Sequence, residues 1–580
     1  MLPGWKQLME KARALSEVDL VLRNAQLVNV FSGEIHHTDI GIHAGKFVGI
    51  GSFPDGKEVI DLSGKYVVPG LIDGHVHIES SHLCPEEFCA LLLAHGVTTA
   101  VVDPHEIANV HGSRGIQYIL DAVAPLPFNT FVALPSCVPA TDLETSGARL
   151  EADDLQEFVG HPQVIALGEV MDYPSVLATK PEMVAKLELP LKLRDGHAPG
   201  ISAQDLNAYF IAGIRTEHEC STVEEARERL RRGFHLMLRQ GSAARNLLEL
   251  LPVVNQDNAQ QCVLVTDDRH CSDLLAEGSI DHLVRLAIQA GFAPVRVIQM
   301  ATINTARAFG LDYLGAVAPG YQADFVVLDN LEQFTIEQVY WHGKLISEHG
   351  QRPKFDHRAT GGLDNSINIG EWDIGKLEVK QVQEHADKAP VSERIAVKVI
   401  GVQTYSLVTT SLRRELPVQA GVIQTDPDQG IVKIAVLERH HGTGRVGVGF
   451  VEGLGLKRGA IASTVAHDSH NMVVVGATDA EIDLAIRTCS EMGGGICVVA
   501  GEEVLGKLPL PIAGLMTDRP PQEVDAALTD LQVKARQLGV TGEVDPFMSL
   551  AFLSLPVIPE LKITDLGLVD VEHFCLTKVV

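Results

Sequence analysis

Short apolar segments alternate with amphipathic stretches from residue 66 to about 290, and this alternation limits the possible folds more than any other feature of the chain. The amphipathic stretches include Pro85–His95, Ala203–Ile211, Val223–Arg232 and Ala243–Leu250. The apolar segments are as short as buried parallel strands usually are. Eight of them can be counted: Val67–Ile72, Thr98–Asp103, Asn129–Leu134, Val164–Glu169, Leu191–Arg194, Gly213–Glu217, Phe234–Arg239 and Cys262–Thr266. This pattern predicts an α/β fold, a closed (β/α)8 barrel of the TIM type, whose active site lies at the carboxyl ends of the strands.

Side chains that bind metals stand at those strand ends. His75 and His77 end the run that begins at Tyr66, and residues two apart on a strand face the same side. A lone His-x-His pair is weak evidence in a chain with 24 His among 580 residues. Chance, however, would also scatter such residues along the helices. A metal centre is therefore predicted at this end of the barrel, with six candidate ligands: His75, His77, Glu169, His197, His218 and Asp267.

The types of ligand indicate which metals could bind and which reaction they could support. Imidazoles and carboxylates without thiolates suit zinc, manganese or ferrous iron. Glu169 has two oxygens and could bridge two ions. A metal lowers the pKa of its bound water to about 7, which gives hydroxide at neutral pH, and Asp267 beside it could take the proton. The expected activity is hydrolysis.

Longer motifs surround the candidate ligands and continue beyond the barrel. They are P-G-L-I-D-G-H-V-H-I-E-S-S from Pro69, D-P-H-E-I-A-N-V from Asp103, G-E-V-M-D-Y-P from Gly168, D-G-H-A-P-G from Asp195, G-S-A-A-R-N from Gly241, T-D-D-R from Thr266, H-D-S-H-N from His467, P-L-P-I-A-G-L-M from Pro509 and A-F-L-S-L-P-V-I-P from Ala551. With these motifs the chain resembles, over nearly its whole length, the adenine deaminases of the amidohydrolase superfamily.

The resemblance implies hydrolytic deamination of adenine to hypoxanthine and ammonia by a metal-bound hydroxide, as in purine salvage. It implies a manganese or iron centre, here expected to be binuclear, held by the same six residues. Many amidohydrolases bridge their metals with a carboxylated lysine on the fourth strand, but this chain has Glu169 there and no lysine nearer than Lys180. That difference argues against a hydantoinase or a dihydroorotase. Two alternatives stay open: another amidohydrolase, such as an N-acyl amide deacylase, and a metal-free binding protein.

Deamination also needs an acid that protonates the ring nitrogen beside the attacked carbon. Adenosine deaminases place a glutamate shortly after the fifth-strand histidine, but here that stretch is His197-Ala-Pro-Gly. We therefore expect Glu106, next to His105 just past the second strand, to be the catalytic acid, because a carboxyl in a closed pocket can keep its proton. Asp268 and Glu219 remain alternatives.

Further residues are candidates for contacts with the substrate. His467 and His470 belong to a polar stretch between apolar runs, which is either a hydrogen-bonded turn joining a strand to a helix or a lid over the barrel. Ser242, after the seventh strand, is expected to cap a helix, and its neighbouring amides could instead face the base. Asp268 follows the proposed ligand Asp267 directly.

A chain of this length is too long for a single core. We expect a small β-sandwich from residues 1–65 and 319–350, the barrel at 66–318, a linker or exposed loop at 351–394, and a C-terminal α/β domain at 395–580 that reaches the active site as a lid. The flanking strands predicted are Leu20–Asn29, Asp39–Ile50, Ala323–Leu328 and Val339–Ile346. The C-terminal domain is expected to contain strands Ile431–Leu437, Met472–Gly476 and Ile496–Val499 and a helix at Asp479–Met492.

Composition limits the partners. The formal net charge is −28, which repels phosphate backbones and anionic membranes, so neither a nucleic acid nor a membrane is an expected partner. Nine Cys at irregular spacing do not form a disulfide framework, and the N-terminus lacks the pattern of a signal peptide. We expect a cytoplasmic enzyme that acts on a small molecule and assembles as a homo-oligomer, a dimer.

Overall fold

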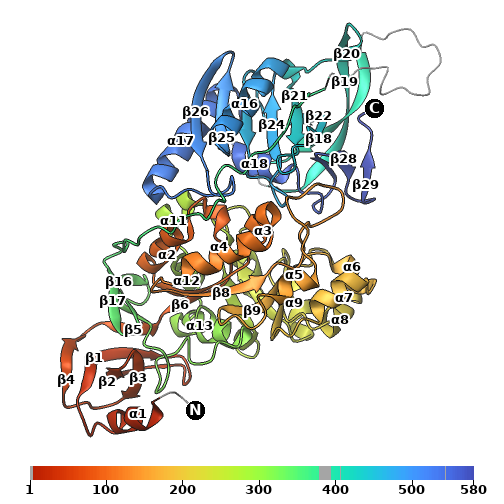
Figure 1. The fold of residues 1–580 in the computed structure, drawn as a ribbon. Coiled ribbons are helices and arrows are strands. Elements are labelled where there is room, and N and C mark those ends of the chain that lie inside the picture. Colours follow the sequence, from red (N-terminus) through yellow and green to blue (C-terminus); the bar gives the residue numbers. More distant parts are fainter. Residues whose placement is uncertain (1–3, 376, 378–393, 405, 543) are drawn as a thin grey trace.

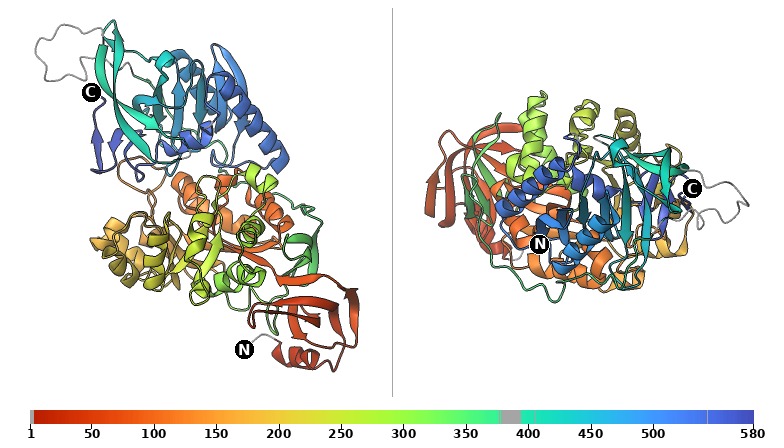
Figure 2. Two further views of the ribbon diagram at one scale, coloured as in Figure 1. Left: turned by 180° about the vertical axis from the view of Figure 1, so that it is seen from behind. Right: turned by 90° about the horizontal axis from the view of Figure 1, so that it is seen from above.

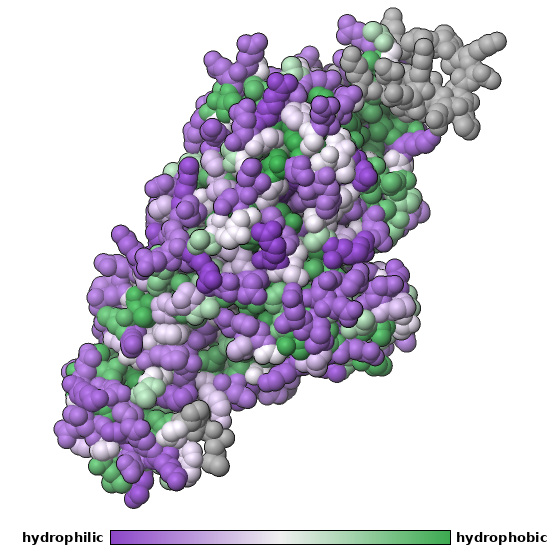
Figure 3. All heavy atoms as spheres, in the orientation of Figure 1, coloured by the Kyte–Doolittle hydropathy of each residue, from purple (hydrophilic) through white to green (hydrophobic). Residues whose placement is uncertain are grey.

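The computed structural model describes residues 4–375, 377, 394–404, 406–542 and 544–580. Three units lie one above the other in Figure 1: an N-terminal β-sheet, a central α/β barrel and a C-terminal α/β domain. The side of the molecule shown in Figure 3 is mostly hydrophilic, in keeping with the strongly acidic composition. Among the described residues, no helix is long and apolar enough to cross a membrane.

The barrel strands run parallel, and their pairing closes a ring within residues 66–318, all of which are described. One sheet runs β10-β9-β8-β7-β6-β14 and a second β11-β12-β13. A bridge between Arg194 and Ile214 links the two sheets, and β13 leads directly into β14, which pairs with β6. The strands are β6 (Leu71–His77), β7 (Val97–Val102), β8 (Asn129–Leu134), β9 (Val164–Val170), β10 (Leu193–Gly196), β11 (Thr216–Glu217), β12 (His235–Arg239), β13 (Cys262–Val265) and β14 (Asp267–Asp268).

The first strand differs from the prediction. The segment expected at Val67–Ile72 spans two elements: β5 (Tyr66–Pro69) and the start of β6. β5 pairs with β1 (Val18–Asn29) and β15 (Phe325–Asn330) in the flanking sheet, whereas β6 is the barrel strand and carries both histidines of the His-x-His pair. The apolar run is continuous in sequence, so periodicity alone could not show where the chain passes from one sheet to the other.

Helices follow most barrel strands. α9 shows why the sequence folds this way locally, because Thr222 and Glu225 form a capping box at its start. The prediction of a helix at Ala243–Leu250 is wrong in extent, since α10 begins only at Leu247 and Ser242 does not cap it. The helices are α2 (Pro85–Ala94), α3 (His105–His111), α4 (Ser113–Val123), α5 (Ala152–Gln156), α6 (Tyr173–Leu177), α7 (Pro181–Leu187), α8 (Asp205–Ile211), α9 (Val223–Arg231), α10 (Leu247–Leu250), α11 (Cys271–Ala276), α12 (Ile280–Gln289), α13 (Pro294–Met300) and α14 (Ile303–Ala308).

Strands from both sides of the barrel form one hydrogen-bonded mixed sheet, in the order β17-β16-β15-β5-β1-β2-β3 with β4 beside β1. A separate apolar core, which includes Leu22, Phe47 and Phe325, joins the two flanks. Two predicted strands are hairpins instead, because turns at Ala44–Gly45 and His342–Gly343 interrupt them. The elements are α1 (Trp5–Ala12), β1 (Val18–Asn29), β2 (Glu34–His43), β3 (Lys46–Ile50), β4 (Gly56–Asp61), β15 (Phe325–Asn330), β16 (Thr335–Trp341) and β17 (Lys344–Glu348).

The expected linker is described at residues 351–375 and 377, where it contains no helix or strand; residues 376 and 378–393 lie outside the described chain. It is not simply an exposed loop. Leu363 and Ile369 are buried, and the Asn368 amide donates to the carbonyl of Arg439 in the C-terminal domain. The stretch around Leu363–Ile369 therefore packs along that domain, whereas Arg352, His357 and Arg358 contact Glu86 and Glu87 of the barrel helix α2.

The C-terminal domain is built on a sheet ordered β20-β19-β18-β22-β21-β24-β23-β25-β26, with a smaller sheet β27-β28-β29. The three strands and the helix predicted here are confirmed to within one residue at each end. The elements are β18 (Arg394–Val402), β19 (Thr409–Gln419), β20 (Val422–Ile423), β21 (Ile431–Leu437), β22 (Val446–Glu452), β23 (Ala460–Ser463), β24 (Met472–Gly476), α16 (Asp479–Glu491), β25 (Gly495–Ala500), β26 (Glu503–Pro509), α17 (Pro521–Gln537), α18 (Pro546–Phe552), β27 (Leu561–Thr564), β28 (Gly567–Asp570) and β29 (Cys575–Thr577).

This domain sits over the end of the barrel at which α3 begins, as Figures 1 and 2 show. Polar contacts join the two: Asp565 accepts hydrogen bonds from the amide and the hydroxyl of Thr145, and His441 Nε2 lies 3.0 Å from the carbonyl oxygen of Ser146. The polar stretch at 467–471 joins β23 to β24, two strands, rather than a strand to a helix. It lies at the carboxyl ends of the barrel strands, where the candidate ligands also stand.

Candidate metal centre

The two histidines at the end of β6 are held by hydrogen bonds on their outer nitrogens. His75 Nδ1 donates to Asp195 Oδ2 at 2.8 Å, and His77 Nδ1 donates to the carbonyl oxygen of Asp103 at 2.9 Å. Both residues are buried. Such bonds fix the tautomer and turn each Nε2 inward, which is how metal-binding histidines are usually oriented.

Glu169, near the end of β9, spans the site. Its Oε1 lies 3.3 Å from His77 Nε2, while its Oε2 lies 2.6 Å from His197 Nδ1 and 3.4 Å from His218 Nε2. His197 and His218 follow β10 and β11, so side chains from distant parts of the sequence meet here. One oxygen of Glu169 therefore faces each half of the candidate ligand set.

Asp267, on β14, completes the ring of six candidate ligands around the barrel mouth. Its Oδ1 lies 3.2 Å from His77 Nε2 and 3.6 Å from His75 Nε2, and its Oδ2 accepts a hydrogen bond from Arg239 Nη1 at 2.8 Å. The same Arg239 nitrogen also pairs with Glu219. Burial alone would raise the pKa of Asp267, but hydrogen bonding by His77 and the positive charge of Arg239 hold it well below its usual range.

These residues fit a divalent cation. Of the groups whose ligand atoms all lie within 4.8 Å of one another, two divide the six candidates between them: His75, His77 and Asp267 form one, and Glu169, His197 and His218 form the other. Within the described chain, the buried His75 Nε2 and both ring nitrogens of His218 have no hydrogen-bond partner. Buried nitrogens without partners are costly, and a metal ion would satisfy them. The six predicted ligands thus lie together in the structure.

His105 and Glu106 begin α3 at the edge of this ring. His105 Nδ1 lies 3.5 Å from Glu169 Oε1, and its ring packs edge-on against His77. Glu106 is fully buried and takes no part in the two ligand groups above. Burial, together with the charges of Glu79 and Asp268, raises the pKa of Glu106 well above its usual range.

The C-terminal domain reaches the same place. His467 Nδ1 lies 3.4 Å from Glu106 Oε1, and Asp468 Oδ1 lies 3.8 Å from His105 Nε2. His470 Nδ1 accepts a hydrogen bond from the Ala466 amide, so its Nε2 carries the proton and faces Glu106 Oε2 at 3.9 Å. Although Glu106, His467 and His470 also lie close enough to hold an ion, that tautomer makes His470 a donor rather than a ligand.

The two remaining candidates are placed differently. Asp268 Oδ1 lies 2.5 Å from the hydroxyl of Ser80, which also lies 3.1 Å from Glu106 Oε1. Ser242 is not with them: its hydroxyl donates to Asp273 and its amide donates to the carbonyl of Asp268. The amide of Ser242 is therefore already used in shaping the loop that carries Asp268.

Sequence reasoning missed the residues that support the ring. Asp195 holds His75, Arg239 holds Asp267, and Asp103 accepts a hydrogen bond from the Glu169 amide at 2.9 Å. A Cβ on Gly168 would lie only 2.1 Å from Asp103 Oδ2, so this position requires glycine. Asp103 and Asp195 stand within the quoted motifs at strand ends, and that position was the available signal.

Two protein-family models match the chain. Residues 66–346 match the model of the amidohydrolase family, which defines the class of protein. Residues 406–575 match the model described as the adenine deaminase C-terminal domain.

Full-length relatives make the assignment narrower. The chain is 52% identical to a protein named adenine deaminase 2 from Carboxydothermus hydrogenoformans, over 99% of both chains. It is 45% identical to proteins named adenine deaminase from Dehalococcoides mccartyi strain CBDB1, over 98% of both chains, and from Nitratidesulfovibrio vulgaris strain Hildenborough, over 100% of this chain and 99% of the other. The chain belongs to the adenine deaminase family of amidohydrolases, as its motifs indicated.

Proposed function

We propose that this protein hydrolyses adenine to hypoxanthine and ammonia. The observation that carries the proposal is the meeting of six metal-binding side chains around Glu169, in a chain 52% identical over its full length to a protein named as an adenine deaminase. The family assignment does not favour the N-acyl amide deacylase considered above.

His75, His77, Glu169, His197, His218 and Asp267 would hold the metal, and the two facing oxygens of Glu169 suit a pair of ions better than one. A divalent ion in this site would supply Lewis-acid activation of water, whose pKa falls to about 7. Manganese or ferrous iron is proposed, and zinc is compatible with the same ligands. Asp267, held as a carboxylate by Arg239, is proposed to accept the proton that the attacking water releases.

Glu106 is proposed as the acid that protonates the ring nitrogen of adenine. The geometry around Ser80 supports a protonated carboxyl, because a hydroxyl has one proton to donate. The Ser80 hydroxyl is closer to Asp268 Oδ1, at 2.5 Å, than to Glu106 Oε1, at 3.1 Å. If Ser80 donates to Asp268, its contact with Glu106 is a hydrogen bond only when Glu106 is the donor. The raised pKa of Glu106 likewise keeps its carboxyl protonated at neutral pH.

Asp268, His467 and His470 are proposed to contact the base. His105 lies between Glu169 and Asp468 and is proposed to orient these groups. His467 stacks on Phe552 with ring centroids 4.4 Å apart, so the C-terminal domain presents a planar surface beside Glu106. Ser242 is proposed to act only through the backbone, by holding the Asp268 loop. The C-terminal domain would then be part of the active site, as the lid interpretation requires.

The test is a metal count combined with a substrate panel. The protein is purified with manganese, the metals per chain are counted, and ammonia is followed from adenine, adenosine and cytosine in parallel. We expect two metals per chain and release of ammonia from adenine. Chelation of the metals should abolish this release. Activity on N-acyl compounds with none on purines would contradict the proposal.

The acidic surface and the nine free cysteines, eight of them buried, favour a reducing compartment, and we propose the cytoplasm and a role in purine salvage. We also propose a homodimer, which light scattering on the purified protein would test.

A further inference from the structure

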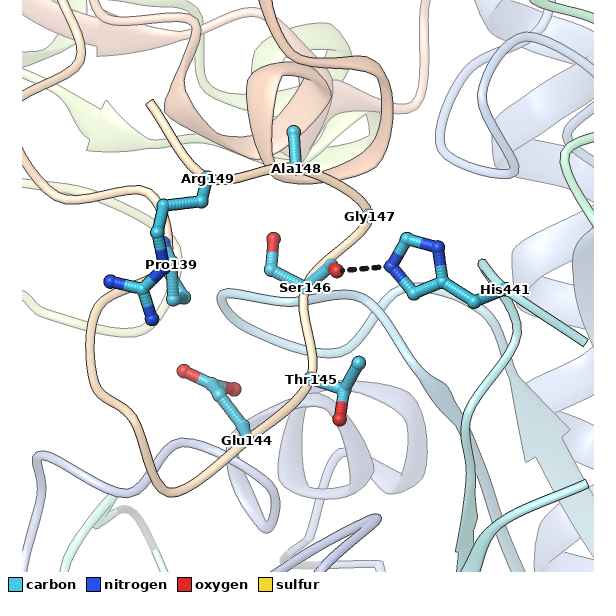
Figure 4. A pocket seen from close by; sticks show the side chains of 8 residues that line it. All are labelled: Pro139, Glu144, Thr145, Ser146, Gly147, Ala148, Arg149 and His441. Atoms are coloured by element: carbon cyan, nitrogen blue, oxygen red, sulfur yellow. Dashed lines mark hydrogen bonds between the residues drawn. The ribbon is translucent and has the colours of Figure 1, made fainter. Parts of the chain in front are cut away.

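A second polar site lies beside the metal centre. The loop that follows β8 encloses a hollow of about 400 Å³ against the C-terminal domain. Figure 4 shows the loop arching around this space, with His441 of the C-terminal domain bonded to the Ser146 carbonyl. At the outer side, the largely exposed Arg149 side chain is paired with Asp142. The lining residues are Pro139, Glu144, Thr145, Ser146, Gly147, Ala148, Arg149 and His441.

Glu144 is a buried carboxylate in this lining without a cationic partner among the described residues. It is only 6% exposed, and neither of its carboxylate oxygens has a well-formed hydrogen bond within the described chain. Burial and the nearby Asp468 and Asp565 raise its pKa to about 8. Polar contact with Ser469 lowers the pKa and so opposes this rise in part. The described residues include no Lys, Arg or His paired with it. Figure 4 shows its carboxylate directed into the hollow.

The side chains behind Glu144 continue to the metal centre. Asp468, next to Ser469, is close enough to raise the pKa of Glu144, and its Oδ2 is also buried without a partner in the described chain. Its Oδ1 lies 3.8 Å from His105 Nε2, and His105 Nδ1 lies 3.5 Å from Glu169 Oε1. Polar side chains, Glu144, Asp468 and then His105, therefore lead from the hollow toward the candidate ligands.

We propose that this hollow is the outlet for the amine product, and that Glu144 and Asp468 form a transit site for ammonium. Their unpartnered oxygens accept hydrogen bonds and donate none when ionised, which suits a small cation that is an N–H donor on every side. The cation would also supply the positive charge that Glu144 lacks. The inference rests on the proposed function, because that reaction is the source of the ammonia.

The lining fits the purine itself less well. A purine base presents ring-nitrogen acceptors as well as donors, and the two carboxylates would leave those acceptors unpaired. Its flat rings would also need a stacking surface, but the lining contains no Phe, Tyr or Trp, and the His441 ring is bonded to Ser146. The base is expected to enter and leave by another route.

A direct test uses thallium(I), a heavy cation that substitutes for ammonium. Crystals of the manganese-loaded protein are soaked in thallium(I) acetate, and anomalous maps are calculated. We expect a peak between Glu144 and Asp468, absent in Glu144→Gln and retained in Asp142→Asn, which changes an exposed carboxylate on the same loop. No peak in the wild-type protein overturns the proposal, whether or not the variant folds.

A kinetic test asks whether the site lies on the product's path. Ammonium chloride should inhibit adenine turnover by the wild-type enzyme more than tetramethylammonium chloride at equal ionic strength. In Glu144→Gln the inhibition constant for ammonium should rise about tenfold, since a charge-assisted hydrogen bond is lost. Asp142→Asn should behave as the wild type does.

The outcomes separate the two proposals. A wild-type enzyme that releases no ammonia from adenine removes the proposed function itself. One that releases ammonia but shows no thallium peak removes only the outlet. A thallium peak with identical ammonium inhibition in Glu144→Gln, at an unchanged melting midpoint, also overturns the outlet.

Discussion

His75 Nδ1 lies 2.8 Å from Asp195 Oδ2, so the imidazole is fixed with its Nε2 turned toward the centre of the barrel mouth. Asp195 is itself fixed, because it accepts hydrogen bonds from the Thr216 hydroxyl at 2.5 Å and from the Gly196 amide at 2.8 Å. The buried carboxylate of Asp195 thus sets the orientation of the candidate ligand His75.

Asp195→Asn should weaken metal binding without removing any of the six candidate ligands. The asparagine offers one acceptor in place of two and no charge, so the ring of His75 is less firmly held. Loss of such a supporting carboxylate typically lowers metal affinity by about 10- to 100-fold. Manganese titration of the apoprotein measures the change. The control is Asp205→Asn, which alters an exposed carboxylate at the start of α8 that accepts a hydrogen bond from Ser202. Equal affinity in both variants would contradict the prediction.

Glu106→Gln should lower turnover of adenine by about 10²- to 10⁴-fold, the usual contribution of a general acid, and leave the number of metals per chain unchanged. The glutamine keeps the size of the side chain but has no acidic proton. Steady-state kinetics and metal analysis on the same sample provide the measurement. Glu86→Gln is a matched control, since Glu86 is an equally buried carboxylate that accepts a hydrogen bond from the Arg358 amide. Undiminished turnover in Glu106→Gln would remove this residue from the mechanism.

The sequence predicted the positions of the ligands because strand ends are a local property. His197, His218 and Asp267 each follow a short apolar run, and parallel strands bring their carboxyl ends to one face. What it could not predict was contact between side chains on separate elements. The pairing of Arg239 with Asp267, and of His467 with Glu106, depends on how distant elements pack, and no periodicity records that.

Local turn chemistry accounts for most differences in the fold. Ser242 looked like a helix cap, but its hydroxyl bonds to Asp273 and the helix begins five residues later. A tertiary hydrogen bond has displaced the local one. The run from Val67 to Ile72 has no polar break, and the pairing of β5 with β15 shows that it serves two sheets.

Arg239→Met should destabilise the metal-free protein. The change leaves the buried Asp267 and the partly buried Glu219 without their cation, and breaking a buried pair from one side costs about 3 to 5 kcal/mol. Bound metal should offset part of this loss, because Asp267 then has another positive partner. Thermal melts with and without manganese compare the two states. Arg227→Met removes an exposed partner of Glu224 and should change the free energy of unfolding by no more than about 0.5 kcal/mol. Similar losses in the two variants would show that the buried pair has no special role.

Lys562 makes stability depend on pH in the C-terminal domain. It is fully buried, and its Nζ donates to the carbonyl oxygens of Leu407 and Phe552 at 2.9 and 3.0 Å. Burial lowers its pKa from 10.5 to about 7. Between those two values the unfolded chain binds a proton that the folded chain does not, so the free energy of unfolding should rise with pH across this window, by on the order of a few kcal/mol.

Lys562→Met should remove that rise, since methionine fills similar space and carries no proton. Urea unfolding at pH 7 and at pH 9.5, followed by a probe in the C-terminal domain, gives the slope for each protein. Lys457→Met changes an exposed lysine whose Nζ also donates to two carbonyl oxygens, and it should keep the wild-type slope. If the slope survives in Lys562→Met, the rise comes from other groups, and Lys562 keeps its proton in the folded chain over this pH range as it does in the unfolded chain.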